Sequence, residues 1–153
     1  MLLAKGEEIN REEDAHFIAY ANIVSKFSPD VKRQVGAVIA KNGHKLTDGH
    51  NKPVLNKKID NYFCQSKQPY MIHAEMDALS KITAKQAKDA TIYITLAPCT
   101  DCCKMIAAYG IQRVVYRDDH KDSNINYLKE LGITVDKYED IFQDYDKIDT
   151  LQE

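Results

Sequence analysis

Two short segments of the 153-residue sequence combine residue types that bind metal ions and move protons: His73-Ala74-Glu75 and Pro98-Cys99-Thr100-Asp101-Cys102. His73, Cys99 and Cys102 offer one imidazole and two thiolates. Three such ligands would leave tetrahedral zinc one position for water, as in catalytic rather than structural sites. Glu75 need not be a ligand, and it is placed to take a proton from that water and deliver it onward.

Both segments are expected where a helix begins, because free N–H groups and the helix dipole favour a thiolate over a thiol there. Apolar residues at helical spacing predict helices over 11–27, 73–87, 99–109 and 123–131. Branched apolar runs predict strands over 35–40, 45–50, 90–96, 111–116 and 133–138. The Asn42-Gly43 pair predicts a tight hairpin between the first two strands.

The alternation of helices and strands after residue 90 predicts parallel pairing through right-handed crossovers. We therefore expect a three-layer α/β/α sandwich with a five-stranded mixed sheet, antiparallel only at the first hairpin. Residues 51–72 show no clear period, and a loop of that length in a compact domain usually lines or covers a site. One domain is expected over 1–153, with its core at about 12–138 and an acidic tail over 139–153.

The composition is that of a globular protein with a real core, at 44% hydrophobic and 29% charged residues. The formal charge of −2 argues against a dedicated binder of long nucleic acid, which normally carries a basic face. Glu7 and Glu8 precede any apolar run of signal-peptide length, and no run reaches the roughly 18 apolar residues of a membrane span. We expect a cytoplasmic protein whose cysteines are ligands or buried thiols rather than disulfides.

A structural zinc site closed by Cys103 or Cys64 is the main alternative to a catalytic centre, but it leaves Glu75 without a role. Cys103 adjoins a candidate ligand and is expected to point away as a buried hydrophobic residue. Cys64 lies in the 51–72 loop and is interpreted as a free thiol.

The pair of motifs is the signature of zinc-dependent nucleobase deaminases. From about residue 12 to 138 the chain resembles the deoxycytidylate (dCMP) deaminase branch of the cytidine deaminase superfamily. The stretches that carry the resemblance, besides the two motifs, are 33–39, Pro69-Tyr70, 95–99 and 110–116. The fold that this resemblance implies agrees with the sandwich expected from the crossovers.

The resemblance implies that His73, Cys99 and Cys102 bind one zinc ion per chain. It also implies that Glu75 shuttles protons while water adds to C4 of cytosine, converting dCMP to dUMP and ammonia. Such a reaction supplies dUMP for thymidylate synthesis. Glu75 would protonate N3 and then the amino group that leaves.

Further roles are implied for residues that would touch the nucleotide. Asn51 would contact the deoxyribose, with a plain turn residue as the alternative, and the backbone N–H of Ala74 would meet the base carbonyl. Either Tyr116 or His120 would pack against the base. The candidates for the 5′-phosphate are Lys32, Arg33, Lys52 and Lys121, with ordinary surface solvation as the alternative for each.

The sequence departs from the family at 49–54, where Gly-His-Asn-Lys-Pro-Val replaces the frequent Gly-Tyr-Asn-Gly-x-Pro. In relatives this region serves nucleotide binding and allosteric control. The resemblance also implies a homohexamer, dCTP and dTTP as effectors, and Mg²⁺ accompanying the effector nucleotide.

Other functions stay open at this stage. A tRNA adenosine deaminase usually has Glu-Pro-Cys-x-Met-Cys, whereas here Ala97 precedes Pro98 and Asp101 takes the methionine position. Deamination of free cytosine, cytidine or guanine is a second enzymatic alternative. A zinc-containing nucleotide-binding module is the non-enzymatic one, and the presence of Glu75 argues against it.

Overall fold

The computed structural model describes residues 11–54 and 70–139. The strands of its main sheet are β1 (Gly36–Lys41), β2 (His44–His50), β5 (Thr91–Leu96), β6 (Arg113–Asp118) and β7 (Thr134–Lys137). The helices are α1 (Arg11–Ser25), α3 (Ala74–Leu79), α4 (Ala84–Ala87), α5 (Thr100–Ala108) and α6 (Ile125–Glu130). The sheet order is β2-β1-β5-β6-β7, which confirms the expected five-stranded mixed sheet.

The strand pairing departs from the sequence prediction at one boundary. Strand β1 is antiparallel to β5 as well as to β2, whereas β5–β6 and β6–β7 are parallel. The prediction that only the first hairpin is antiparallel was therefore wrong. The reason is that the chain crosses from β2 through α3 to β5, which keeps β5 parallel to β2 and hence antiparallel to the β1 strand between them.

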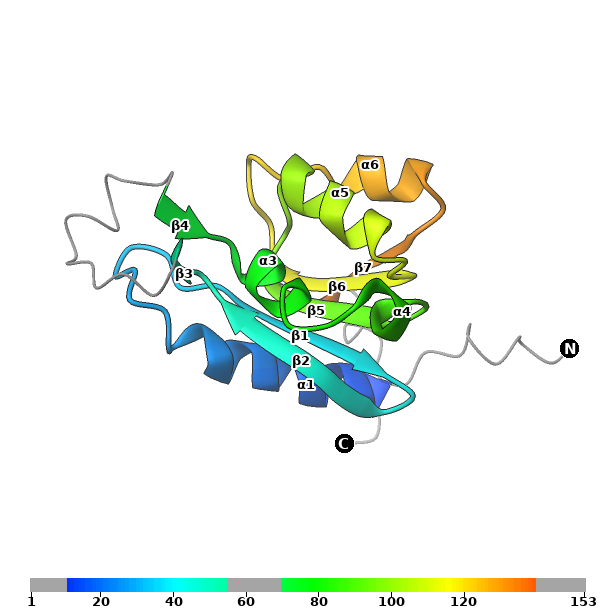
Figure 1. Ribbon diagram of the computed structural model, residues 1–153, viewed down its shortest axis with the longest axis horizontal. Coiled ribbons are helices and arrows are strands. Elements are labelled where there is room, and N and C mark those ends of the chain that lie inside the picture. Colours follow the sequence, from blue (N-terminus) through cyan, green and yellow to red (C-terminus); the bar gives the residue numbers. More distant parts are fainter. Residues whose placement is uncertain (1–10, 55–69, 140–153) are drawn as a thin grey trace, which may run out of the picture.

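The helices cover both faces of the sheet, as the three-layer prediction requires (Figure 1). Side chains of a strand alternate between faces, so Val38 and Ala40 of β1 pack with α1, while Ala37 and Ile39 face the other core. That second core also contains residues of α3, α5 and α6. Among the described residues, no helix is both long and apolar enough to span a membrane.

Helix α1 is shorter than expected and buries a narrower stripe. The apolar pattern over 11–27 predicts one buried stripe that includes Ile23 and Phe27. Phe17, Ala21 and Val24 are buried, but Ile23 is 61% exposed and Phe27 is 70% exposed, so the prediction was wrong for these two residues. Six residues after Phe17, Ile23 is rotated by about 240° around the helix axis and faces away from the sheet. Phe27 lies beyond the end of the helix at Ser25.

The helix expected over 73–87 is two helices. Helix α3 ends at Leu79, and α4 begins after Thr83 with a capping box. The Thr83 hydroxyl accepts a hydrogen bond from the Gln86 backbone N–H (3.1 Å), and the Gln86 side chain accepts one from the Thr83 N–H (2.9 Å). This reciprocal pair starts a new helix and overrides the continuous apolar pattern.

Helix α3 lies directly on β2. A Cβ atom at Gly49 would collide with the Ala74 carbonyl oxygen and the Ala78 amide nitrogen, so only glycine allows this approach. The Thr47 hydroxyl donates a hydrogen bond to the Ala78 carbonyl oxygen (3.1 Å). These contacts fix how closely α3 packs on β2. The first residues of α3 belong to the His73-Ala74-Glu75 motif.

The region expected to be a loop over 51–72 begins and ends in a small sheet. Strand β3 (Lys52–Pro53) pairs antiparallel with β4 (Met71–Ile72). Two-residue strands show no period in sequence, so pattern analysis missed them. Cys64 and the rest of 55–69 lie outside the described residues, as does the acidic tail beyond Glu139.

A buried charge network ties α1 to the strands. Arg113 makes two hydrogen bonds to the Asp14 carboxylate (2.8 and 2.9 Å) and a third to Asp136 of β7 (2.9 Å). The Tyr93 hydroxyl also donates to Asp14 (2.9 Å), and burial beside that carboxylate raises the pKa of Tyr93. Asp14 is 1% exposed, so the network stabilises the packing of α1 only while every member keeps its partner.

Replacing Asp14 with Ala is expected to lower the free energy of unfolding by about 3–5 kcal/mol, because the Arg113 charge loses its main buried partner. Urea unfolding measures this loss. Lys45→Met, which breaks the more exposed ion pair with Asp48, is the control and should cost no more than about 1 kcal/mol. Equal losses in the two variants would contradict a dominant role for the buried network.

Candidate active site and metal centre

The two motifs meet because each occupies the beginning of a helix at the same end of the sheet. His73 is the N-cap of α3 and follows β4 directly. Cys99 is the N-cap of α5 and follows the end of β5 at Leu96 by three residues. Neither side chain makes a capping hydrogen bond to the start of its helix, so both are available as ligands.

His73, Cys99 and Cys102 form a cluster in which the three potential ligand atoms lie within 4.8 Å of one another. The His73 Nδ1 atom is 3.3 Å from the Cys102 Sγ and 3.6 Å from the Cys99 Sγ. A tetrahedral zinc ion with its usual bond lengths would require N–S separations of about 3.6 Å. The separations and the donor set therefore fit zinc.

The electrostatics of the cluster also favour a cation. Burial raises the pKa of the Cys102 thiol, and the nearby Glu75 carboxylate and Cys99 raise it further. A divalent cation held between the sulfur atoms would reverse this effect and stabilise both thiolates. Ionising both thiols beside Glu75 therefore requires a cation between the sulfur atoms.

Glu75 lies beside this cluster. It is 4% exposed, and burial raises the pKa of its carboxyl group above the ordinary value. Nearby His73 and hydrogen bonds from the backbone and from Cys102 act in the opposite direction. A carboxyl group in such surroundings suits proton exchange with a reacting group.

A cavity of about 370 Å³ opens in front of the cluster, within the size range of small-molecule sites. Three site residues, His73, Glu75 and Cys99, are part of its wall. The rest of the wall comprises the apolar residues Val35, Met71, Ala74, Leu96 and Ala97 and the polar residues Asp30, Arg33, Asn51, His120 and Asp122.

Cys103 points away from the cavity, as the sequence predicted. It is fully buried in the core beneath α5, and its thiol faces the carbonyl oxygens of Pro98 (3.7 Å) and Asn124 (3.5 Å). Within the described residues, the fourth ligand of a closed structural site is therefore not supplied by Cys103. Cys64, the other candidate for that ligand, is not described.

Asn51 lines the cavity, but its side chain already binds the backbone. The Asn51 carbonyl oxygen accepts from the Val35 N–H (2.9 Å), and its amide donates to the Arg33 carbonyl oxygen (2.8 Å). One N–H and one lone pair remain for a ligand. The turn role considered from sequence and a sugar contact are thus compatible.

Arg33 and His120 meet across the cavity, with the Arg33 Nη1 atom 2.6 Å from the His120 Nε2 atom. The other ring nitrogen of His120 accepts a hydrogen bond from the Asp122 N–H (2.9 Å). Asp30, which sequence analysis did not select, accepts from the Arg33 N–H (3.2 Å) and shapes the turn that carries this arginine. The segment Ser28-Pro29-Asp30 is typical of a turn, and it is the sequence signal that could have identified Asp30.

Four of the candidates for contact with the base or the phosphate do not line this cavity: Tyr116, Lys32, Lys52 and Lys121. Tyr116 is 8% exposed within β6. The Lys52 ammonium forms an ion pair with Asp77 at 2.8 Å. Arg33 is the one phosphate candidate that the structure brings to the cavity wall.

Replacing Cys102 with Ser is expected to remove most of the bound zinc, because a serine hydroxyl is a far weaker zinc ligand than a thiolate. Cys103→Ala is the matched control one residue away and should retain about one zinc per chain. Metal analysis of the purified proteins by mass spectrometry measures both. Equal zinc content in the two variants would contradict the assignment of Cys102.

Comparison with known proteins agrees with this geometry. The family model described as the cytidine and deoxycytidylate deaminase zinc-binding region matches residues 11–118. The deoxycytidylate deaminase of Mus musculus is 28% identical, over 88% of this chain and 86% of the mouse protein. The deoxycytidylate deaminase of Homo sapiens is 29% identical, but the alignment covers 68% of this chain and 64% of the human protein.

A solved structure shares both sequence and fold. It is the dCMP deaminase from the cyanophage S-TIM5 in complex with dCMP and dUMP, which is 30% identical. The two structures superpose with a TM-score of 0.75 over 85% of this chain and 99% of the phage chain. With the family match extending over most of its length, the chain belongs to the cytidine and deoxycytidylate deaminase family.

Proposed function

We propose that this protein is a hydrolase that converts dCMP to dUMP and ammonia. The observation that carries the proposal is the buried Glu75 carboxyl in the wall of the same cavity as the His73, Cys99 and Cys102 cluster. Similarity to the mouse and human deoxycytidylate deaminases and to the phage enzyme supports dCMP as the substrate.

His73, Cys99 and Cys102 would hold the metal. Zinc bound there would supply a Lewis acid that lets a water molecule lose a proton near neutral pH and so become a stronger nucleophile. Glu75 takes one proton from the attacking water and delivers it to N3 of the cytosine ring. After the new C–O bond forms at C4, Glu75 transfers the remaining proton of that oxygen to the amino group. The C4–N bond then breaks, the C4 carbonyl forms, and ammonia leaves.

The cavity wall offers groups that orient the base. The N–H groups in the first turn of a helix have no acceptor within the helix, so the Ala74 N–H at the start of α3 can donate to the base carbonyl oxygen. The remaining amide capacity of Asn51 suits a deoxyribose hydroxyl. His120 in the cavity wall is a better candidate for contact with the base than Tyr116, which is not part of that wall.

Arg33 is the strongest candidate for the 5′-phosphate. Arg33 lines the cavity, its backbone N–H is bonded to Asp30, and its guanidinium contacts His120, another residue of the wall. A guanidinium recognises phosphate through two parallel hydrogen bonds, which a lysine cannot reproduce. The solvent-exposed Lys32 and Lys121 stay outside the wall.

Further properties are proposed from the sequence and from the family resemblance. The sequence favours a single domain over 1–153 and a cytoplasmic location. The resemblance implies a homohexamer, with dCTP and dTTP as effectors and Mg²⁺ accompanying them. Because the sequence at 49–54 departs from the family pattern, effector binding needs a test of its own, apart from catalysis.

Replacing Glu75 with Gln is expected to reduce ammonia release by at least about 100-fold, because the amide cannot carry the transferred proton. Zinc content should stay close to one per chain, since Glu75 is not a ligand in the proposal. A coupled ammonia assay and metal analysis measure the two quantities. A fully active variant would refute the mechanism.

A substrate panel of dCMP, deoxycytidine, dCTP and a tRNA anticodon stem-loop tests the identity of the substrate. Turnover of dCMP is expected to exceed that of the other three, and each assay is repeated with dCTP or dTTP as effector. Preferred turnover of the stem-loop would establish the tRNA alternative instead. Equal turnover of deoxycytidine and dCMP would contradict phosphate recognition.

Replacing Arg33 with Met is expected to raise the KM for dCMP by about 10- to 100-fold. This range corresponds to the loss of a charged hydrogen bond that contributes about 1.5–3 kcal/mol to binding. The kcat should change much less. Lys32→Met is the matched control from the neighbouring position and should leave both parameters within about twofold. Steady-state kinetics with dCMP distinguish these outcomes, and an unchanged KM in the Arg33 variant would exclude the assignment.

A further inference from the structure

Asp77 is a buried charged group that the proposed reaction does not use. Its side chain is 3% exposed, and it lies one helical turn after His73, with the Asp77 N–H bonded to the His73 carbonyl oxygen (3.0 Å). The carboxylate faces three groups from other positions. Lys52 Nζ is 2.8 Å from Oδ1, the His50 N–H donates to Oδ2 (3.1 Å), and Lys81 Nζ is 3.8 Å from Oδ2.

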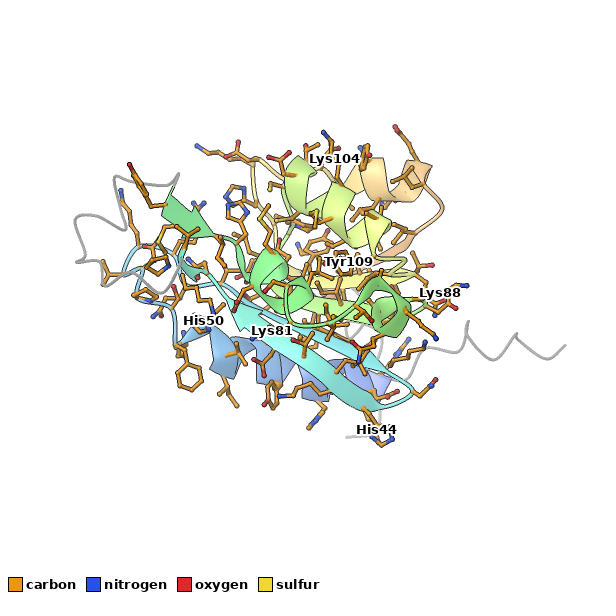
Figure 2. All side chains as sticks on the ribbon, in the orientation of Figure 1. His44, His50, Lys81, Lys88, Lys104 and Tyr109 are labelled. Atoms are coloured by element: carbon orange, nitrogen blue, oxygen red, sulfur yellow. The ribbon has the colours of Figure 1, made fainter. Side chains whose placement is uncertain are left out.

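Lys52, the nearer of the two lysines that pair with Asp77, is itself partly buried. Its side chain is 26% exposed, whereas that of Lys81 is 46% exposed. In Figure 2, His50 lies at the end of β2, and Lys81 lies farther from β3 than His50 does. Of the two lysines near Asp77, Lys52 therefore makes the shorter and less solvated ion pair, and it comes from the strand that leads away from the cavity residue Asn51.

The ion pair closes a ring of contacts around His73. Lys52 is paired in register with Ile72 in the small β3–β4 sheet, and Ile72 immediately precedes His73. From His73 the chain enters α3 and reaches Asp77, whose carboxylate returns to Lys52. The strand pairing and the ion pair thus hold the same short turn from both sides.

This ring joins two parts of the cavity wall. One part is Asn51, which precedes Lys52 and binds the backbone of Arg33 and Val35. The other is the start of α3 with His73, Ala74 and Glu75. A shift of the 50–52 turn relative to α3 would move the two parts against each other, and small displacements of this kind cost large factors in rate.

We propose that Lys52 and Asp77 form a positioning pair that holds the Asn51 turn against the helix start bearing His73 and Glu75. Lys52 then acts through Asp77 and does not bind the substrate phosphate. The kinetic part of the proposal rests on the proposed deaminase function, whereas its structural part does not.

The test compares Lys52→Met, Asp77→Asn and the double variant with Lys81→Met as the matched control. Asparagine keeps an acceptor for the His50 N–H and removes only the charge. With dCMP, each single variant is expected to lower kcat about tenfold with KM changed less than threefold. The double variant should be no worse than the singles, because both remove the same interaction. Lys81→Met should stay within twofold of wild type, and Lys52→Arg should recover part of the lost kcat.

The competing role for Lys52 gives a different pattern. If its ammonium binds phosphate, Lys52→Met raises KM with little change in kcat, and Asp77→Asn frees the lysine and leaves KM unchanged or lower. If the pair only stabilises the fold, both variants lower the thermal midpoint and leave kcat unchanged. Either pattern would overturn the proposal.

Amide hydrogen exchange over residues 70–77 tests the ring without any substrate. Exchange there should accelerate at least about tenfold in both single variants and stay unchanged in Lys81→Met. Unchanged exchange in the Lys52 and Asp77 variants would refute the ring even if dCMP is the substrate. Absence of dCMP turnover in the wild-type protein would refute the proposed function while leaving this measurement decisive for the pair.

Discussion

Helix α3 and strand β2 are in backbone contact at Gly49, where no side chain could be accommodated between them. This contact sets where the first residues of α3 lie relative to the sheet, and those residues include His73 and Glu75. Helix α5 packs in the same core layer and presents Cys99 and Cys102 from its own beginning. The potential ligands come together because both helices pack in fixed positions on the same face of one sheet.

The charges of the site depend on that arrangement. Burial and the nearby Glu75 carboxylate raise the pKa of the Cys102 thiol, so a Cys102 thiolate beside an ionised Glu75 is unfavourable. A cation among the ligand atoms removes this conflict for the sulfur atoms and leaves the carboxyl free to exchange protons. Cys103, one residue away, faces carbonyl oxygens in the core and is not part of the cluster.

The departure from the family pattern at 49–54 has a structural counterpart. Where relatives often have glycine after the asparagine, this chain has Lys52, and its ammonium finds a buried carboxylate at Asp77. A glycine turn can bend freely, whereas a turn held by an ion pair and a strand pairing cannot. The positioning proposed for this pair would make the turn a fixed part of the catalytic cavity.

The sequence by itself determined the features whose chemistry is local. Spacing within the motifs predicted Cys99 and Cys102 as a ligand pair, and His73 with Glu75 as its partner motif. Apolar runs predicted the five strands. Each of these signals depends on neighbours within one helix turn or strand. Only the tertiary structure decided the antiparallel β1–β5 pairing, the β3–β4 sheet, and the ion pair between Lys52 and Asp77. These depend on residues far apart in the chain, whose meeting is set by the crossover path and the helix–sheet packing and leaves no pattern in any short window.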